Sequence, residues 1–331
     1  MKMDTDANRM FLEDAGEIVM SRGGKDIWLV KGITRHEAFR DRCLPDKIYV
    51  VDFPGRGSGE ELLLSRQACG PEKFLMIKEV GHEMMRLFER MFDGKVAQFV
   101  ILWGGRPLDL LDANPPLQRS GLLDTTYIKL TRIEDKMGFR GWNIVESSFV
   151  GEWWPDDTWI IMEECIASGQ TLTYFVEEAL QQHRPRKIFL FPVCASLEGL
   201  EGICRICSDR SVELIPVFNS ALIQVAEKGV SLPFTDLGLQ PHTIVTRHFY
   251  QDLRDRYQAT PLCWVGDIGD SIYKPEEHLI ETLRDMLAVG VDYEREDFSL
   301  WSPLVRSEKF LASLQASHPE VFRQVQPYLS L

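Results

Sequence analysis

The chain has 331 residues, of which 44% are hydrophobic and 26% are charged, as in a globular protein with a sizeable core. Its formal net charge of −13 argues against nucleic acid as a partner, because phosphate-backbone binding needs a basic surface. No apolar run is long enough to cross a bilayer, so we expect no membrane partner. The N-terminal segment lacks the pattern of a signal peptide and the seven cysteines are scattered, so we expect a cytoplasmic protein.

The first predicted elements are short strands, of which the clearest covers 46–53, followed by a turn-rich segment at 54–61. Apolar residues at helical spacing then predict an amphipathic helix over 72–92. Apolar strands are predicted at 96–102, 158–162, 187–193 and 212–218, with helices at 171–183 and 197–207. Strands of this kind separated by helices indicate an α/β fold with a parallel sheet flanked by helices.

We expect three parts along the chain. An N-terminal extension covers 1–70, and an α/β domain covers 71–275 with an added stretch near 228–260. The remaining residues, 276–331, are predicted to form a mostly helical C-terminal extension that packs on the core.

Two adjacent carboxylates, Glu163 and Glu164, follow the strand predicted at 158–162. A small-residue turn and the start of a helix come next, with hydroxyls at Ser168 and Thr171. Free backbone N–H groups at a helix start suit a phosphate, and carboxylates beside them suit a ribose diol. In parallel sheets, ligands bind at the carboxyl ends of strands near a switch point. The alternative is an ordinary capped helix after a strand, with both glutamates in solvent.

The segment WIIMEECIASGQTL (159–172) resembles the ribose-phosphate loop of type I phosphoribosyltransferases, in which an acidic pair precedes Thr-Gly-Gly-Thr or a close variant. Three further segments resemble the uracil phosphoribosyltransferase branch. VILWGGRPL (100–108) is similar to its pyrophosphate loop, and ASLEGLEGI (195–203) to a helix start. WVGDIGDSIY (264–273) is similar to the segment that lines its base pocket. The four segments occur in the family's order.

The resemblance implies the type I phosphoribosyltransferase fold and an enzyme that transfers 5-phosphoribosyl from phosphoribosyl pyrophosphate to a planar acceptor. Uracil or a related heterocycle is the expected acceptor, and pyrophosphate is released. Glu163, Glu164 and Asp267 receive catalytic roles. Mg²⁺ is expected on substrate oxygens, with Asp267 as a candidate ligand. Small-molecule substrates and a homodimer follow from the same resemblance.

The resemblance also assigns binding roles. The residues expected to cradle the 5-phosphate are Ala167, Ser168, Gly169, Gln170 and Thr171. Those expected to bind pyrophosphate are Gly104, Gly105, Arg106, Lys129 and Arg132, although a solvated strand face also explains the last two. The expected acceptor pocket comprises Trp264, Val265, Gly266, Asp267 and Asp270, although turn chemistry also explains the two aspartates.

Several positions depart from the family pattern. Glu163 stands where Asp is usual, Gln170 replaces the second glycine of the loop, and Trp103 replaces an arginine. Ground-state binding tolerates such changes better than transition-state geometry does, so a non-catalytic or regulatory protein that binds phosphoribosyl pyrophosphate or a nucleotide stays open. The Cys-x-x-Cys pair at 204–207 is interpreted as two buried small side chains rather than a zinc or redox site.

Overall fold

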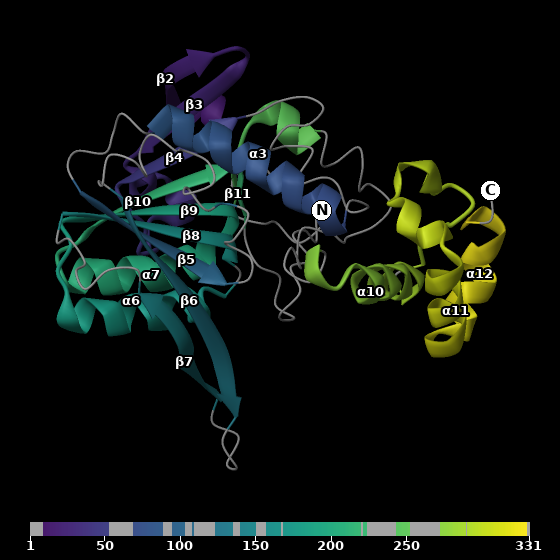
Figure 1. The fold of residues 1–331 in the computed structure, drawn as a ribbon. Coiled ribbons are helices and arrows are strands. Elements are labelled where there is room, and N and C mark those ends of the chain that lie inside the picture. The colour runs from purple at the N-terminus through teal and green to yellow at the C-terminus, as the bar shows by residue number, and fades with distance from the viewer. Residues whose placement is uncertain are drawn as a thin grey trace.

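A computed structural model covers the chain and describes most of it. The described residues are 9–52, 69–88, 95–102, 108, 123–134, 140–149, 157–166, 168–219, 221–223, 243–251, 272–288 and 290–329. Figure 1 shows a central sheet with helices on both faces and a group of helices beside it at the C-terminal end.

The central sheet is mainly parallel. In spatial order its strands are β2 (Gly16–Arg22), β3 (Lys25–Lys31), β4 (Lys47–Asp52), β10 (Glu213–Asn219), β9 (Lys187–Ser196), β8 (Thr158–Ile166), β5 (Val96–Leu102), β6 (Leu123–Glu134) and β7 (Arg140–Phe149). The strands from β4 to β6 in this order are parallel. At the edges, β7 is antiparallel to β6, and β3 and β2 continue from β4 in antiparallel pairs. This arrangement leaves the strands in the middle of the sheet with their carboxyl ends at one common edge.

Three short strands extend this sheet near the carboxyl end of β9. β11 (Ala221–Ile223) pairs with the last residues of β9, β12 (Thr243–Val245) pairs with β11, and β1 (Arg9–Phe11) pairs with β12. A short helix, α1 (Leu12–Ala15), follows β1, and two 3₁₀ turns, η1 (Ile33–Arg35) and η2 (Glu37–Phe39), precede β4. The N-terminal segment is therefore tied to the same sheet edge as the later strands.

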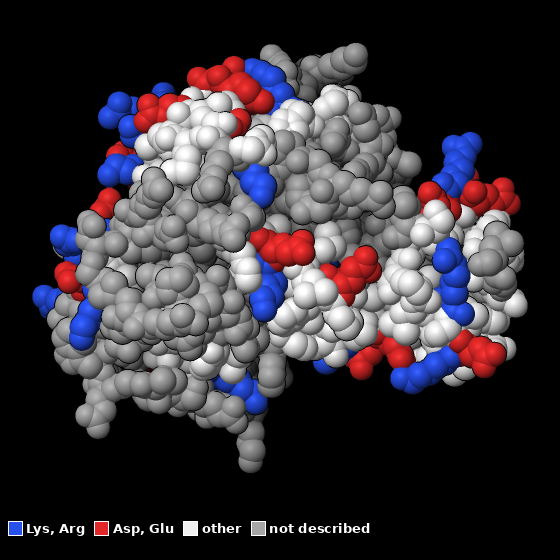
Figure 2. All heavy atoms as spheres, turned by 45° about the horizontal axis from the view of Figure 1, so that its top comes forward, with Lys and Arg blue, Asp and Glu red and all other residues white. Residues whose placement is uncertain are grey.

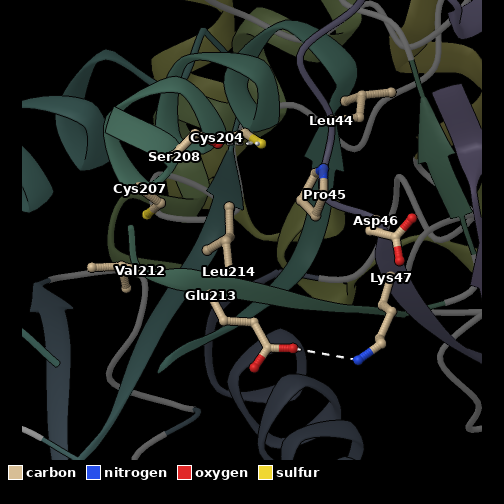
Figure 3. Close-up of a pocket in the computed structure, with 10 residues that line it drawn as sticks. All are labelled: Leu44, Pro45, Asp46, Lys47, Cys204, Cys207, Ser208, Val212, Glu213 and Leu214. Atoms are coloured by element: carbon tan, nitrogen blue, oxygen red, sulfur yellow. Dashed lines mark hydrogen bonds and ion pairs between the residues drawn. The ribbon is translucent and has the colours of Figure 1, made fainter. Parts of the chain in front are cut away.

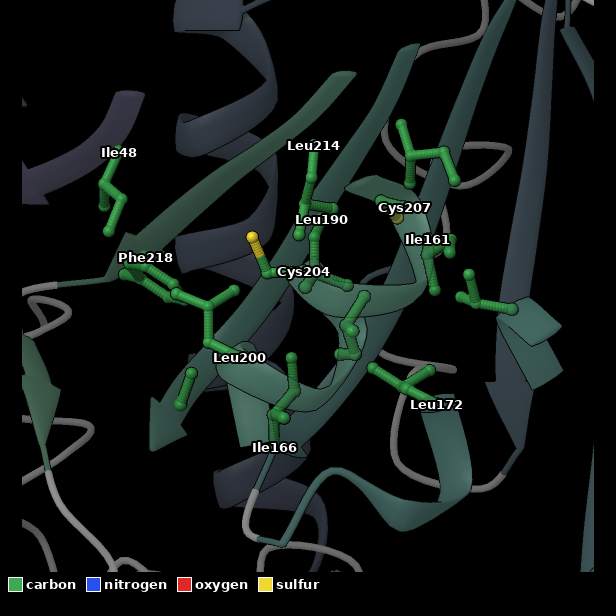
Figure 4. Close-up of a cluster of buried hydrophobic side chains, with 14 of the residues drawn as sticks. Ile48, Ile161, Ile166, Leu172, Leu190, Leu200, Cys204, Cys207, Leu214 and Phe218 are labelled. Carbon is green, nitrogen blue, oxygen red and sulfur yellow. The ribbon is translucent and has the colours of Figure 1, made fainter. Parts of the chain in front are cut away.

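Helices cover both faces of the sheet. α3 (Gly70–Phe88) lies on one face, and α6 (Gln170–Gln182) and α7 (Leu197–Asp209) lie on the other (Figure 1). The core under α6 and α7 is apolar and aromatic: the ring centroids of Phe99 and Trp159 are 5.0 Å apart, and those of Phe99 and Phe175 are 5.3 Å apart. Figure 4 shows how Leu200 and Cys204 of α7 point into this core beside Leu190 and Phe218. Burial of this face fixes the register of the strands, because a one-residue slip would turn their apolar side chains to the opposite face.

The C-terminal region forms a second apolar cluster. Its elements are α10 (Pro275–Ala288), η5 (Phe298–Leu300), η6 (Pro303–Arg306), α11 (Glu308–Ser317) and α12 (Pro319–Leu329). Phe310 and Leu314 are completely buried between these elements, and Cys69, just before α3, is part of the same cluster. The start of α3 therefore connects the sheet to the C-terminal helices.

The fold class predicted from the sequence is confirmed, and the predicted strands and helices within the described residues are present. One strand was predicted too short: β8 does not end at residue 162 but runs to Ile166. Its last residues stay in the sheet because Cys165 and Ile166 pair with Cys194 and Ala195 of β9. β4, which lies in the expected N-terminal extension, joins the central sheet by pairing with β10. The boundaries expected between the three parts of the chain stay predictions. None of the described helices is both long and apolar enough to span a membrane.

Candidate functional site

The direction of strand order reverses between β5 and β8. The chain adds β6 on one side of β5, and then adds β8, β9 and β10 on the other side. In a sheet of this kind the crevice at the carboxyl ends of the two central strands is the usual ligand site. Val100 near the end of β5 pairs with Met162, the residue before Glu163. The acidic pair predicted to contact ribose therefore lies at this switch point.

Glu163 is a buried carboxylate at the carboxyl end of β8. The residue is 8% exposed, and the alternation of the strand places it on the same face as Trp159 and Ile161. Burying a carboxylate costs free energy unless the group interacts with a partner or a ligand. The buried position of Glu163 therefore makes it a candidate for such an interaction. The alternative in which both glutamates simply face solvent is wrong for Glu163. Glu164 lies in the same strand.

Gly169 has the backbone conformation that the loop after β8 requires. Its φ of 69° is in the left-handed region, and it precedes the first residue of α6. A Cβ at this position would lie 2.5 Å from the carbonyl oxygen of Gly199 and 2.6 Å from its Cα. Because both neighbours are backbone atoms, only glycine fits. Gln170 is the first residue of the helix and does not have positive φ, so the replacement of the family's second glycine imposes no backbone conflict there.

The first turn of α6 has no capping side chain, because its N-cap residue is Gly169. α7 differs: Ser196 caps it by accepting a hydrogen bond of 2.9 Å from the backbone N–H of Gly199. At the start of α6, Ser168 and Gln170 are exposed and Thr171 is half-buried. The first N–H groups of α6 and its positive dipole end are of the kind that binds anions in other proteins.

Lys129 and Arg132 lie on the strand beside this crevice. Lys129 pairs with Leu102, the last residue of β5, and β6 continues from there to Glu134. With β7 it forms a hairpin that extends beyond the other strands of the sheet (Figure 1). The structure thus places Lys129 at the carboxyl end of β5 and Arg132 farther out on the hairpin. Their expected contact with pyrophosphate stays a prediction.

The other predicted site residues lie outside the described residues. They are Ala167 in the phosphate loop, Gly104, Gly105 and Arg106 in the pyrophosphate loop, and Trp264, Val265, Gly266, Asp267 and Asp270 in the acceptor pocket. The roles assigned to them, and the metal ligand proposed at Asp267, stay predictions.

Sequence reasoning missed one buried charge at the same sheet edge. Asp52 ends β4 and is 6% exposed, and burial raises its pKa to about 6 against the lowering effect of His248. The sequence feature that could have indicated this buried residue is an aspartate directly after the apolar run IYVV at 48–51.

A pocket of about 240 Å³ lies at the opposite edge of the sheet (Figure 3). Lys47 and Glu213, the first residues of β4 and β10, form an ion pair of 3.4 Å at this pocket. Cys204 and Cys207 line another side, and burial raises the pKa of each thiol to about 12. The interpretation of this Cys-x-x-Cys pair as buried small side chains is confirmed. The pocket is distant from Glu163, so it does not belong to the candidate site.

Charged side chains are interspersed on the face shown in Figure 2, where described acidic and basic residues alternate. Among the described residues drawn in this view, no broad basic surface is present. An anion held by these parts of the chain would therefore depend on local backbone geometry rather than on the overall field. The start of α6 has such geometry.

Comparison with known proteins gives structural likenesses only. No protein-family model matches the chain, and no curated protein matches it in sequence. The AQ2163 protein from Aquifex aeolicus is 18% identical with a TM-score of 0.39, and the match covers 58% of this chain and 96% of that chain. An adenine phosphoribosyl transferase from Trypanosoma brucei is 8% identical with a TM-score of 0.33, covering 52% and 83% of the two chains.

A third solved structure, the APRTase from Giardia lamblia complexed with 9-deazaadenine, is 13% identical with a TM-score of 0.28. That match covers 45% of this chain and 80% of the other. Two of these three solved structures are therefore transferases for adenine rather than uracil. Likenesses of this size carry no argument about activity, so function has to follow from the residues of this chain.

Proposed function

We propose that the protein is a phosphoribosyltransferase-like enzyme that transfers 5-phosphoribosyl from phosphoribosyl pyrophosphate to a planar acceptor. The observation that supports this most directly is the segment from Glu163 in β8 to the start of α6. It combines a buried carboxylate, Glu163, with an uncapped helix start at Gly169, and it lies at the switch point of the sheet. Together these features would suit the two ends of a ribose 5-phosphate.

The helix start is suited to the 5-phosphate. Ser168, Gly169, Gln170 and Thr171 would surround it mainly with backbone N–H groups, because no N-cap side chain competes for them. Ala167 would complete the loop. An anion held by a helix start needs no lysine or arginine, which fits the acidic composition of the chain.

Glu163 is suited to the ribose. Its carboxylate would accept hydrogen bonds from the ribose hydroxyls and stabilise the positive charge that develops on the ring during transfer. In the reaction, the bond from the ribose C1 to a pyrophosphate oxygen breaks, and a bond from C1 to an acceptor nitrogen forms as that nitrogen loses its proton. Lys129, Arg132 and the 104–106 segment would bind the leaving pyrophosphate.

Mg²⁺ is compatible with these residues. Within the described residues, no three or more His, Cys, Asp or Glu side chains form a metal-binding group. Mg²⁺ keeps several waters and needs few protein ligands, so one carboxylate such as Asp267 would complete a site made mainly of substrate oxygens. When bound there, the ion would offset the charge of the leaving pyrophosphate.

The proposed acceptor is uracil or a related heterocycle, bound near residues 264–270. The competing function is a non-catalytic protein that binds phosphoribosyl pyrophosphate or a nucleotide through the same loop. The two functions share the donor site and differ in turnover, so one set of measurements separates them.

The test combines calorimetric binding of Mg²⁺–phosphoribosyl pyrophosphate with an assay of pyrophosphate release in the presence of uracil and other nucleobases. We expect donor binding and acceptor-dependent release by the wild type. Glu163→Gln should lower release roughly 100-fold or more, as expected for a lost preorganised electrostatic group. Glu177→Gln, on the exposed surface of α6, is the matched control and should change neither quantity. Binding without release would establish the non-catalytic function, and the absence of binding would exclude both.

A further inference from the structure

The pocket at the opposite edge of the sheet from Glu163 has room for a small molecule (Figure 3). Its volume is about 240 Å³, whereas an engineered apolar cavity of about 150 Å³ already binds benzene. Three segments line it: residues 44–47 at the start of β4, one side of α7 near its end, and residues 212–214 at the start of β10. The pocket is therefore a product of the tertiary structure and lies apart from the phosphate loop.

Hydrogen bonds between these segments hold the pocket walls in place. The backbone N–H of Cys43 donates to Glu201 Oε1 on α7 at 3.2 Å, and Arg42 Nη1 lies 3.5 Å from the other carboxylate oxygen. At the end of α7, the N–H of Val212 donates to the carbonyl of Cys207 at 2.9 Å. A ligand would meet preformed walls, which reduces the ordering that binding requires.

The inner part of the pocket is apolar and uncharged. Leu44, Val212 and Leu214 line it and remain 7%, 7% and 6% exposed. Cys204 and Cys207 line the same part, and burial raises the pKa of each thiol to about 12, so neither carries charge at neutral pH. Covering apolar surface that water still contacts is favourable, so this part of the pocket suits an apolar group.

The mouth of the pocket carries charges of both signs. Asp46, Lys47 and Glu213 are all exposed. Lys47 Nζ lies 3.4 Å from Glu213 Oε1, and the two side chains are 45% and 51% exposed. Figure 3 shows this ion pair on one side of the pocket, with Leu44 and Cys204 on the opposite side. The pocket is thus open to solvent at a charged end and closed at an apolar end.

This combination restricts the charge of a ligand. An ion with a single charge would meet Lys47 and Glu213 together, so attraction by one side chain would be offset by repulsion from the other. An exposed ion pair contributes little to stability, so the pair can open for a ligand at small cost. A ligand with both charges can then pair with both side chains at once, and Asp46 offers a second acceptor for its cationic group.

We propose that this pocket binds a small zwitterion with an apolar body, of the class of α-amino acids with apolar side chains. The carboxylate of the ligand pairs with Lys47, its ammonium group pairs with Glu213 and Asp46, and its side chain fills the apolar part. The site does not depend on the proposed function, because none of the residues that line it belongs to the phosphate loop.

The test measures binding of L-phenylalanine and L-leucine to the full chain by calorimetry. We expect saturable binding of at least one of them with a Kd below about 1 mM. Three comparison compounds each remove one feature: glycine lacks the apolar side chain, phenethylamine lacks the carboxylate, and 3-phenylpropionate lacks the ammonium group. Each should bind at least tenfold more weakly than the better amino acid.

Substitutions at the mouth test the two charged contacts. Lys47→Gln and Glu213→Gln should each weaken amino-acid binding at least tenfold, and Glu213→Gln should also reduce the advantage of phenylalanine over 3-phenylpropionate. Because both side chains are exposed, the melting temperature should stay close to that of the wild type. Lys309→Gln is the matched control, since it removes an exposed lysine that pairs with Glu276 in the C-terminal helices, and it should not change binding.

The inference is overturned if neither amino acid binds the wild type, or if Lys47→Gln and Glu213→Gln bind as tightly as the wild type. Equal binding of glycine or of the two singly charged compounds would also overturn it. Binding of Mg²⁺–phosphoribosyl pyrophosphate in the same samples reports on the phosphate loop alone, so failure of the pocket and failure of the proposed function are distinguished.

Discussion

Gly169 lies so close to the backbone of Gly199 that it cannot carry a side chain. The Cα of Gly199 lies 2.6 Å from the position that a Cβ on Gly169 would occupy. Gly199 belongs to the first turn of α7, so the loop after β8 packs directly on the helix after β9. This contact fixes the start of α6, and with it the proposed phosphate site.

Gly169→Ala should therefore weaken donor binding and destabilise the fold. The substitution adds a clash with backbone atoms to the cost of a left-handed alanine, which by itself is about 1–2 kcal/mol. Calorimetry with Mg²⁺–phosphoribosyl pyrophosphate and thermal denaturation would measure both effects. Gly290→Ala is the matched control, because Gly290 has a φ of 76° and nothing within 4 Å of its Cβ position. Equal losses of donor affinity and thermal stability in Gly169→Ala and Gly290→Ala would show that the contact between Gly169 and Gly199 does not shape the site.

Ser196→Ala should reduce both stability and donor affinity. Ser196 is fully buried and its hydroxyl holds the N–H of Gly199, so its loss costs about 1 kcal/mol and loosens the surface against which Gly169 packs. Ser307→Ala removes a similar cap from α11, where Ser307 accepts from the N–H of Phe310. The control should lower the melting temperature without changing donor affinity. Unchanged donor affinity in Ser196→Ala would show that the cap of α7 does not contribute to the phosphate site.

Asp52→Asn should stabilise the protein at neutral pH. Burial raises the pKa of Asp52 from 3.8 to about 6, with Asp26 and Glu13 acting in the same direction and His248 against it. Because the folded pKa exceeds the unfolded one, the folded state is favoured while the group is protonated, and this advantage is lost as the pH rises through about 6. A shift of this size corresponds to at most about 3 kcal/mol.

Urea denaturation of wild type and Asp52→Asn between pH 4 and pH 8 would measure this difference. The variant should be more stable at pH 7.5, and the difference should disappear towards pH 4, where both side chains are neutral. A variant less stable than wild type at pH 7.5 would show that the Asp52–His248 pair stabilises the fold. The expected gain marks Asp52 as a residue retained at a cost to stability.

Cys204 and Cys207 should resist alkylation in the folded protein. Their pKa of about 12 leaves roughly one thiol in ten thousand ionised at pH 8, and the thiolate is the reactive form. Mass spectrometry after iodoacetamide treatment at pH 8 should find both unlabelled until denaturant is added. Cys43, which is partly exposed, provides the internal comparison. Rapid labelling of Cys204 or Cys207 before Cys43 would contradict their burial.

Local patterns in the sequence determined most of the elements. The apolar run at 96–102 predicted a strand whose bounds match β5, and the pattern at 171–183 predicted α6 to within one residue. Burial on both faces of a parallel sheet and the amphipathic stripe of a helix are both written into the order of side chains. The local pattern could not predict the end of β8, because residues 163–166 stay in the strand through pairing with β9.

For the candidate site too, some features follow from the local sequence and others only from the tertiary structure. The sequence by itself determined that an acidic pair and a glycine turn join a strand to a helix, since both are local. Only the tertiary structure decided that Glu163 is buried, that Gly169 must be glycine because of Gly199, and that Asp52 shares its sheet edge. These facts depend on strand order and helix packing between residues far apart in the chain. Composition and periodicity carry no record of which distant segments meet.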